Sequence, residues 1–260
     1  GFVLDAECQQ LGDVHGSLAR FDTLAAIMTM IADNLQRVRA RLEDACRACG
    51  RDPSAVTLLA VSKTFDATAV REAHAAGQTA FGENYLQEAV DKMAALADLP
   101  LVWHCIGPIQ SNKTRLVAEH FDWAHTVDRL KIAQRLSEQR PAQRAPLQVC
   151  LQVNIDGGPT KSGVAPSDAL ALAREVAQLP GLVLRGLMTI PEPAPDFATA
   201  LAVHRHARAL FDQLCAAGLA LDTLSMGMTA DLEAAVHAGS TMVRVGTAIF
   251  GGRAPAAAPG

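Results

Sequence analysis

The sequence predicts an α/β protein built as a single (β/α)8 barrel, the TIM-barrel architecture, with an extra N-terminal helix. Eight short apolar runs rich in branched residues alternate with longer segments of helical periodicity. Apolar runs without polar alternation are typical of strands buried on both faces, as in a parallel sheet covered by helices. A doubly wound open sheet is the alternative architecture. The GxGxxG signature that follows its first strand in dinucleotide-binding proteins does not occur in this sequence.

The expected elements follow in order along the chain. A leading helix is expected over Asp33–Cys49, where Leu35, Val38 and Leu42 recur at helical spacing before Gly50 ends the segment. The eight expected strands are Thr57–Ser62, Ala80–Glu83, Val102–Ile106, Trp123–Val127, Leu147–Asn154, Val183–Thr189, Thr223–Met226 and Met242–Val245. The helices expected between them are Ala67–Ala76, Leu86–Leu96, Lys113–His120, Leu130–Gln139, Ser167–Gln178, Phe197–Ala217 and Asp231–Ala238.

The chain divides into one domain and two flanking segments. We expect residues 30–253 to form the barrel, and residues 254–260 to be a frayed, low-complexity tail. Residues 1–29 are expected to be an extension that is disordered or artefactual, because a clean amphipathic stretch begins only after Met28 and Met30.

Composition narrows the class of partner. The net charge of -4 argues against a nucleic-acid or membrane-surface role, and no apolar run reaches the ~18 residues of a spanning helix. The six cysteines are scattered, so we expect reduced thiols in a cytoplasmic protein. Cys46 and Cys49 form a single CxxC without a second pair, and we expect no metal site. The expected partner is a small molecule.

The ends of the last two strands have the residue types of a phosphate-binding cradle. In a (β/α)8 barrel, ligands bind at the carboxyl ends of the strands, and anionic groups are often held after strands seven and eight. Gly227 and Gly246 would let backbone N–H groups approach an anion, and Thr229 and Thr247 add hydroxyl donors. The alternative is that both glycines only form tight turns.

Lys63 ends the apolar run of the first strand, which neighbours the eighth once the barrel closes. A lysine amine beside a phosphate cradle fits pyridoxal phosphate, which carries an aldehyde and a phosphate on one ring. The alternative is a lysine whose amine reaches solvent from a strand end. Arg244 shares the strand parity of Gly246, and an arginine that faces the pyridine nitrogen leaves the ring unprotonated and weak as an electron sink.

Seven separated motifs resemble the pyridoxal phosphate homeostasis protein family over about residues 30–253: "LLAVSKT", "FGENYLQEAVDKM", "WHCIGPIQSNK", "HTVDR", "VNI…KSG", "RGLMTIP" and "LSMGMTADLEAAVHAGSTMVRVGTAIFGGR". The resemblance implies a barrel similar to the N-terminal domain of alanine racemase, with the cofactor bound as a Schiff base on Lys63. It also implies a cofactor site formed by Asn84 near the ring, Arg244 at the pyridine nitrogen, Thr229, Gly246 and Thr247 at the phosphate, and Ser225 at the seventh strand end. Thr229 departs from the family's usual serine but keeps a hydroxyl. Lys161 in "KSG" matches a family position that could contact cofactor or effector.

Two other functions compete with a cofactor carrier. A racemase or decarboxylase of the same barrel type is the first, and racemases of this type use a tyrosine from a separate all-β domain as a second base. This sequence has a single tyrosine, Tyr85, and Tyr85, His104 or Cys105 could replace that base. A nucleotide hydrolase is suggested by "GPIQSNKT" (Gly107–Thr114), which has Asn112 where a phosphate-binding loop requires glycine.

The sequence therefore predicts a cytoplasmic carrier that buffers pyridoxal phosphate and delivers it to dependent apo-enzymes, and that thereby affects vitamin B6 and amino-acid balance. We expect no catalytic residue and no robust turnover. The resemblance suggests a monomer.

Overall fold

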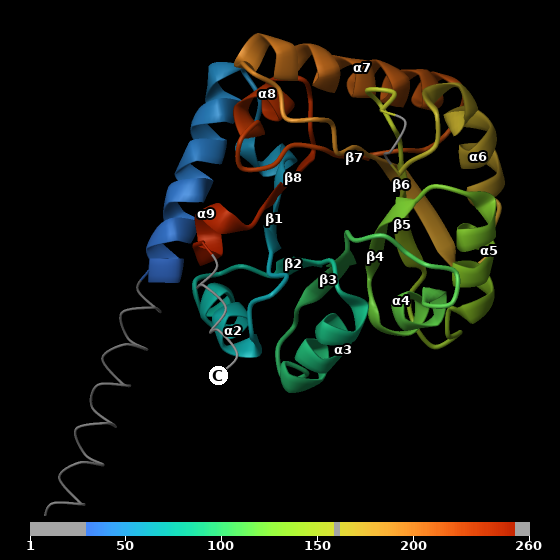
Figure 1. Cartoon of the computed structure of the whole chain (residues 1–260), viewed down its shortest axis with the longest axis horizontal. Helices are drawn as coiled ribbons and strands as arrows, with labels where there is room; N and C mark the ends of the chain where they lie inside the picture. Colours follow the sequence, from blue (N-terminus) through green and yellow to red (C-terminus); the bar gives the residue numbers. More distant parts are fainter. Residues whose placement is uncertain (1–29, 159–161, 253–260) are drawn as a thin grey trace, which may run out of the picture.

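The computed structural model describes residues 30–158 and 162–252, and in this part of the chain eight parallel strands form a closed barrel (Figure 1). Each strand pairs with the next in sequence, and β8 returns to pair with β1. The predicted (β/α)8 fold is confirmed. The strands are β1 (Thr57–Val61), β2 (Ala80–Glu83), β3 (Val102–Cys105), β4 (Trp123–Val127), β5 (Leu147–Gln152), β6 (Leu182–Met188), β7 (Thr223–Ser225) and β8 (Met242–Val245).

Helices surround the barrel and connect successive strands (Figure 1). They are α2 (Ala67–Ala75), α3 (Leu86–Ala95), α4 (Thr114–His120), α5 (Leu130–Gln139), α6 (Ala169–Val176), α7 (Phe197–Ala216), α8 (Leu232–His237) and α9 (Thr247–Phe250), with 3-10 turns η1 (Pro53–Ala55) and η2 (Pro166–Asp168). The helix expected over Ser167–Gln178 is therefore shorter, because its first residues belong to η2.

Several strands end earlier than the apolar runs predicted. Ser62, Asn154 and Thr189 follow β1, β5 and β6 instead of belonging to them. At these positions the backbone no longer pairs with both neighbouring strands. It keeps a hydrogen bond to one of them, as from the Ser62 amide to the Gly82 carbonyl and from the Thr189 amide to the Ser225 carbonyl. These polar residues thus lie at the carboxyl mouth of the barrel.

The main core lies between the strands and the helices that cover them, while the barrel interior holds only a small apolar cluster. That inner cluster contains Leu59, Val61, Ile106 and Met242. Leu59 of this cluster pairs in register with Arg244 of β8, so a charged side chain directly adjoins the apolar cluster. The barrel interior is therefore apolar in part and polar near its carboxyl mouth.

The predicted leading helix is present over residues 30–48 and lies beside α8 and α9 (Figure 1). Its buried face includes Leu35 and Leu42. Asn34 Nδ2 donates to the Ile249 carbonyl at 2.9 Å, and Arg41 pairs with Glu233 at 2.5 Å. The leading helix therefore braces the two helices that follow β7 and β8.

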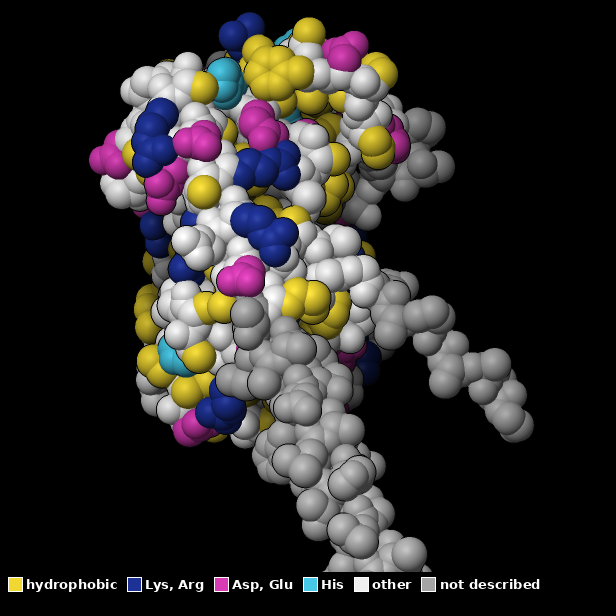
Figure 2. Space-filling view, turned by 90° about the vertical axis from the view of Figure 1, so that its left-hand side faces the viewer, with side chains coloured by type: hydrophobic (Ala, Val, Ile, Leu, Met, Phe, Trp, Pro, Cys, Tyr) yellow, Lys and Arg dark blue, Asp and Glu magenta, His cyan; other side chains and the backbone are white. Residues whose placement is uncertain are grey.

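The face that contains this helix carries basic and acidic side chains intermixed (Figure 2). No helix among the described residues is long and apolar enough to cross a membrane. The predicted extension 1–29, the tail 254–260 and Lys161 lie outside the described residues.

Candidate functional site

The predicted site residues lie at the carboxyl ends of four neighbouring strands. Lys63 and Asn84 follow β1 and β2, Ser225 ends β7, and Arg244 belongs to β8. Because β8 pairs with β1, the strands β7, β8, β1 and β2 are consecutive around the barrel. Thr229 lies in the loop after β7, and Gly246 and Thr247 follow β8. The fold thus gathers all seven at one sector of the barrel mouth.

The two glycines of the predicted cradle have different reasons to be glycine. Gly227 has φ of 95°, and a Cβ there would lie 2.4 Å from the Cβ of Ala235, so Gly227 forms a tight turn. Gly246 has an ordinary negative φ. A Cβ on Gly246 would lie 3.2 Å from the Val61 carbonyl oxygen, so this glycine permits close approach of the β8–α9 turn to β1.

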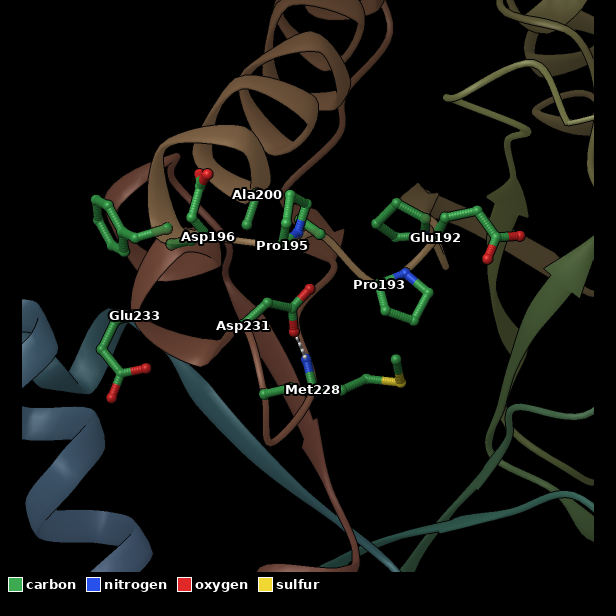
Figure 3. Close-up of a pocket in the computed structure, with 13 residues that line it drawn as sticks. Glu192, Pro193, Pro195, Asp196, Ala200, Met228, Asp231 and Glu233 are labelled. Atoms are coloured by element: carbon green, nitrogen blue, oxygen red, sulfur yellow. Dashed lines mark hydrogen bonds between the residues drawn. The ribbon is translucent and has the colours of Figure 1, made fainter.

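Asp231 fixes the loop that carries Thr229. Its carboxylate accepts a hydrogen bond from the Met228 amide at 2.7 Å, the dashed line in Figure 3, and lies 2.8 Å from His204 Nε2. Burial raises the pKa of Asp231, but the bonds from His204 and Met228 outweigh it and hold that pKa below its usual value. The anionic carboxylate therefore keeps the loop after β7 in place.

The same loop forms one wall of an apolar pocket of about 400 Å³ (Figure 3). The opposite wall is the proline-rich segment after β6, which includes Pro193 and Pro195, and Phe197 at the start of α7 is half exposed beside it. Met228 and Ala230, the neighbours of Thr229 in sequence, are among the residues that line this pocket.

Arg244 is a buried cation inside the barrel, with 4% of its surface exposed. Its guanidinium donates to Ser225 Oγ and to the Thr189 carbonyl oxygen, both at 2.8 Å. Burial lowers the pKa of Arg244 to about 10, so the side chain stays charged at neutral pH. A ligand in this sector would meet a fixed positive charge.

Two buried histidines extend this network across the barrel. His125 Nδ1 lies 3.0 Å from Ser225 Oγ, and His125 Nε2 lies 2.9 Å from His104 Nδ1. Arg244 has only donors, so Ser225 Oγ accepts from it. The tautomer of each neutral imidazole sets the direction of the Ser225–His125 and His125–His104 bonds. Sequence reasoning did not select His125, although a histidine inside the apolar strand "WAHTV" was a usable signal.

Burial keeps both histidines neutral. It lowers the pKa of His104 to about 3, and burial together with the nearby His104 and Arg244 lowers the pKa of His125 well below its ordinary value. In the His125–His104 bond one ring nitrogen must accept, so at least one of the two rings is a neutral imidazole, because an imidazolium cannot accept a hydrogen bond. The network therefore presents Arg244 in one fixed arrangement.

Acidification is expected to destabilise the fold through these histidines. An unfolded histidine takes up a proton near a pKa of about 6.5, whereas folded His104 resists protonation down to a pKa of about 3. Between these pKa values the unfolded chain binds more protons than the folded chain. The free energy of unfolding therefore decreases as the pH is lowered, by roughly 1 kcal/mol per pH unit for each histidine. Denaturant titrations from about pH 7 to about pH 5 measure this slope. A His104→Gln variant should have a shallower slope, and the exposed His206→Gln control an unchanged one; equal slopes in all three proteins would contradict the prediction.

Three buried polar atoms at the mouth have no hydrogen-bond partner among the described residues: Asn84 Oδ1, Asn154 Oδ1 and Thr189 Oγ1. They follow β2, β5 and β6. An unsatisfied buried polar atom costs about 1–3 kcal/mol, so three at one barrel end indicate a place for a polar ligand. Asn154 and Thr189 were not selected from the sequence, because their apolar runs made them look like strand residues.

Lys63 is half buried and lies in the loop after β1, within the sector formed by β7, β8, β1 and β2. It lies two residues beyond Val61, which ends β1 and belongs to the inner cluster. Phe65 stacks on Phe250 of α9 with ring centroids 5.0 Å apart. The loop that carries the lysine is thereby attached to the helix that begins at Thr247. The lysine amine, the buried guanidinium and the unsatisfied polar atoms suit a ligand that has both a carbonyl and an anionic group.

The residues considered for other functions are placed differently. Cys105 is fully buried, and burial raises the pKa of its thiol to about 12. Tyr85 is 51% exposed. In "GPIQSNKT", the motif that resembles a phosphate-binding loop, Gly107 packs against the Asn84 backbone, and α4 begins only after Lys113. No group of three or more acidic, histidine or cysteine side chains within residues 30–158 and 162–252 is arranged to hold a metal ion.

The chain is similar in sequence to a known family model and to two named bacterial proteins. Residues 31–254 match the family model for the N-terminal domain of alanine racemase. A pyridoxal phosphate homeostasis protein from Pseudomonas aeruginosa is 63% identical over 226 residues, which cover 87% of this chain and 97% of that protein. The protein of the same name from Escherichia coli K12 is 53% identical over 229 residues, covering 87% of this chain and 98% of its own.

The fold of the chain is also similar to that of solved structures. PipY from Synechococcus elongatus PCC7942, with pyridoxal phosphate (PLP) bound, has a TM-score of 0.75 and 41% identity, covering 85% of this chain and 100% of PipY. An alanine racemase from Clostridium difficile 630 has a TM-score of 0.68 at 14% identity, covering 88% of this chain and 58% of the racemase. The second match shows likeness of fold alone.

Proposed function

Because the chain belongs to the pyridoxal phosphate homeostasis protein family, we propose that it holds pyridoxal 5'-phosphate as a Schiff base on Lys63. The observation that carries this proposal is the meeting of Lys63, buried Arg244 and unsatisfied Asn84 at one sector of the barrel mouth. When bound, the cofactor supplies an aldehyde that reacts with an amine and a ring that withdraws electrons.

Each remaining residue has a binding role in this proposal. Asn84 supports the ring side, and Ser225 holds Arg244 toward the pyridine nitrogen. Thr229 and Thr247 give hydroxyl donors to the phosphate, and Gly246 lets the backbone approach it. Asn154 and Thr189 extend the site on the side of β5 and β6, where their buried oxygens are otherwise unsatisfied within the described part of the chain.

We further propose that the protein is a cytoplasmic carrier, which buffers the cofactor and delivers it to dependent apo-enzymes without robust turnover. Support comes from the surroundings of Arg244, whose guanidinium keeps its protons and therefore leaves the pyridine ring a weak electron sink. Two of the groups considered as a second base, Cys105 and His104, also support it. The pKa of Cys105 is raised to about 12 and that of His104 is lowered to about 3, both by burial, and neither value suits proton exchange near neutral pH.

An amino-acid racemase is the second candidate, because the family model matched is that of an alanine racemase domain. Incubating the loaded protein with single L-amino acids and following chirality by chromatography separates the two functions. A carrier produces no D-amino acid above the level of the Lys63→Ala variant.

The Lys63→Ala variant is expected to lose covalent loading. Wild-type protein mixed with pyridoxal phosphate should gain the visible absorbance of a Schiff base and, after borohydride reduction, a stable mass adduct on the peptide that contains residue 63. Lys131→Ala, on the exposed side of α5, is the matched control and should load normally. A reduced adduct of equal yield in Lys63→Ala would refute the assignment of Lys63.

A further inference from the structure

Side chains of α3 hold both peptide groups that flank Lys63. The Ser62 carbonyl accepts a hydrogen bond from Lys92 Nζ at 2.9 Å. The Thr64 amide donates to Glu88 Oε1 at 2.7 Å. Because these two peptide groups meet at the Cα of Lys63, holding both fixes the direction in which its side chain leaves the backbone.

The groups that make these bonds form one ion network behind the lysine. Glu83 Oε1 accepts from Lys92 Nζ and from Ser62 Oγ, both at 2.6 Å, and Lys92 Nζ also lies 3.2 Å from Glu88. The side chains of Lys92 and Glu83 are only 3% and 0% exposed. Burying two charges is costly, and a well-packed apolar pair is often at least as stable. Beyond packing, this network supplies hydrogen bonds to the backbone around Lys63.

The backbone it holds is unusual. Thr64 has φ of 68°, the left-handed region that a β-branched residue rarely adopts. Such a conformation persists only where its surroundings impose it, and it is concentrated at functional sites. The bond from Thr64 to Glu88 and the turn bond from the Phe65 amide to the Ser62 carbonyl, 3.1 Å, are the contacts that impose it here.

We propose that Glu83, Glu88 and Lys92 act as a clamp of positioning residues that aims the Lys63 amine at the cofactor. This inference rests on the proposed function for its ligand. The clamp itself is a property of the cofactor-free chain. None of its three members needs to touch the cofactor.

Glu88 offers the cleanest test, because it is partly exposed and its removal leaves the Lys92–Glu83 pair intact. In cofactor-free Glu88→Ala protein, amide hydrogen exchange across residues 62–65 should accelerate about tenfold, and the dissociation constant for pyridoxal phosphate should rise about tenfold, as expected when a charge-assisted hydrogen bond is lost. Glu88→Gln keeps an acceptor for the Thr64 amide and should restore most of both properties. Asp91→Ala, an exposed change on the same helix, should alter neither.

Unchanged exchange in Glu88→Ala would overturn the clamp. Faster exchange with an unchanged dissociation constant would also overturn it, because the backbone would then be held without effect on the lysine. A wild-type protein that forms no reducible adduct would refute the proposed function. The exchange comparison, made without cofactor, would still decide whether the clamp exists.

Discussion

Replacing Lys92 with methionine is expected to lower the free energy of unfolding by about 3 to 5 kcal/mol, the usual result of leaving one buried charge without its partner. Methionine fills much of the same space but leaves the Glu83 carboxylate, which is 0% exposed, without its ammonium. The Ser62 carbonyl would lose its donor as well. Urea titration of the single variant beside wild type measures the loss.

The double variant Glu83→Gln/Lys92→Met should recover most of this stability. Glutamine keeps an acceptor for Ser62 Oγ and removes the charge that burial disfavours. A double variant as unstable as Lys92→Met would show that shape, and not charge, determines the loss. Asp91→Ala, exposed on the same helix, serves as the control and should unfold like wild type.

The loss in Lys92→Met should also depend on pH, with a definite sign. Burial raises the pKa of Glu83 even in the presence of Lys92, and removing the ammonium raises that pKa further. A carboxyl with a raised folded pKa contributes stability that is present at low pH and lost as the pH rises through that value. The deficit of the single variant relative to wild type should therefore shrink on acidification, because protonation neutralises Glu83. A deficit that grows on acidification would contradict this account.

Gly107→Ala is expected to destabilise the protein by at least about 3 kcal/mol and to weaken cofactor binding. A Cβ on residue 107 would lie 2.3 Å from the Asn84 carbonyl oxygen and 2.7 Å from its Cα, and both are backbone atoms. Residue 107 cannot move away easily, because its carbonyl accepts a hydrogen bond from Thr126 Oγ1 at 2.6 Å. The strain should therefore displace Asn84, which lies in the proposed site.

Thermal unfolding and cofactor titration of Gly107→Ala measure the two effects. Gly252→Ala, with nothing within 4 Å of the added carbon, is the matched control and should behave like wild type. If Gly107→Ala were as stable as Gly252→Ala, the tight contact between the β2 and β3 ends would be wrong.

The architecture could be read from the sequence because burial on both faces leaves a strong signal. The bounds of β2, β4 and β8 were predicted correctly, since each is a short apolar run. The ends of β1, β5 and β6 were overestimated, because Ser62, Asn154 and Thr189 continue those runs while the backbone already turns into the mouth. Strand pairing, which decides where a strand ends, cannot be seen in one sequence.

The position of the candidate site was predictable, but its supporting contacts were not. The rule that ligands bind at strand carboxyl ends selected Lys63 and Arg244, and the family resemblance added Asn84. His125 meets Ser225 across 100 positions of sequence. Lys92 looked like an ordinary charged helix residue, yet its ammonium is buried behind the strand that leads to Lys63. Such contacts depend on which faces the closed barrel brings together, and periodicity gives only the face of each element.

The pairing of β8 with β1 also has a consequence for the newly made chain. Lys63 follows the first strand, whereas Thr229, Gly246 and Thr247 follow the last two. During synthesis the amine emerges long before the residues that would hold a phosphate, and the two meet only when the final strand closes the ring. A ligand that needs both therefore binds the completed fold and adds its free energy of binding to that state alone. On this basis, the supply of cofactor in a cell would help determine how much of the newly synthesised chain stays folded.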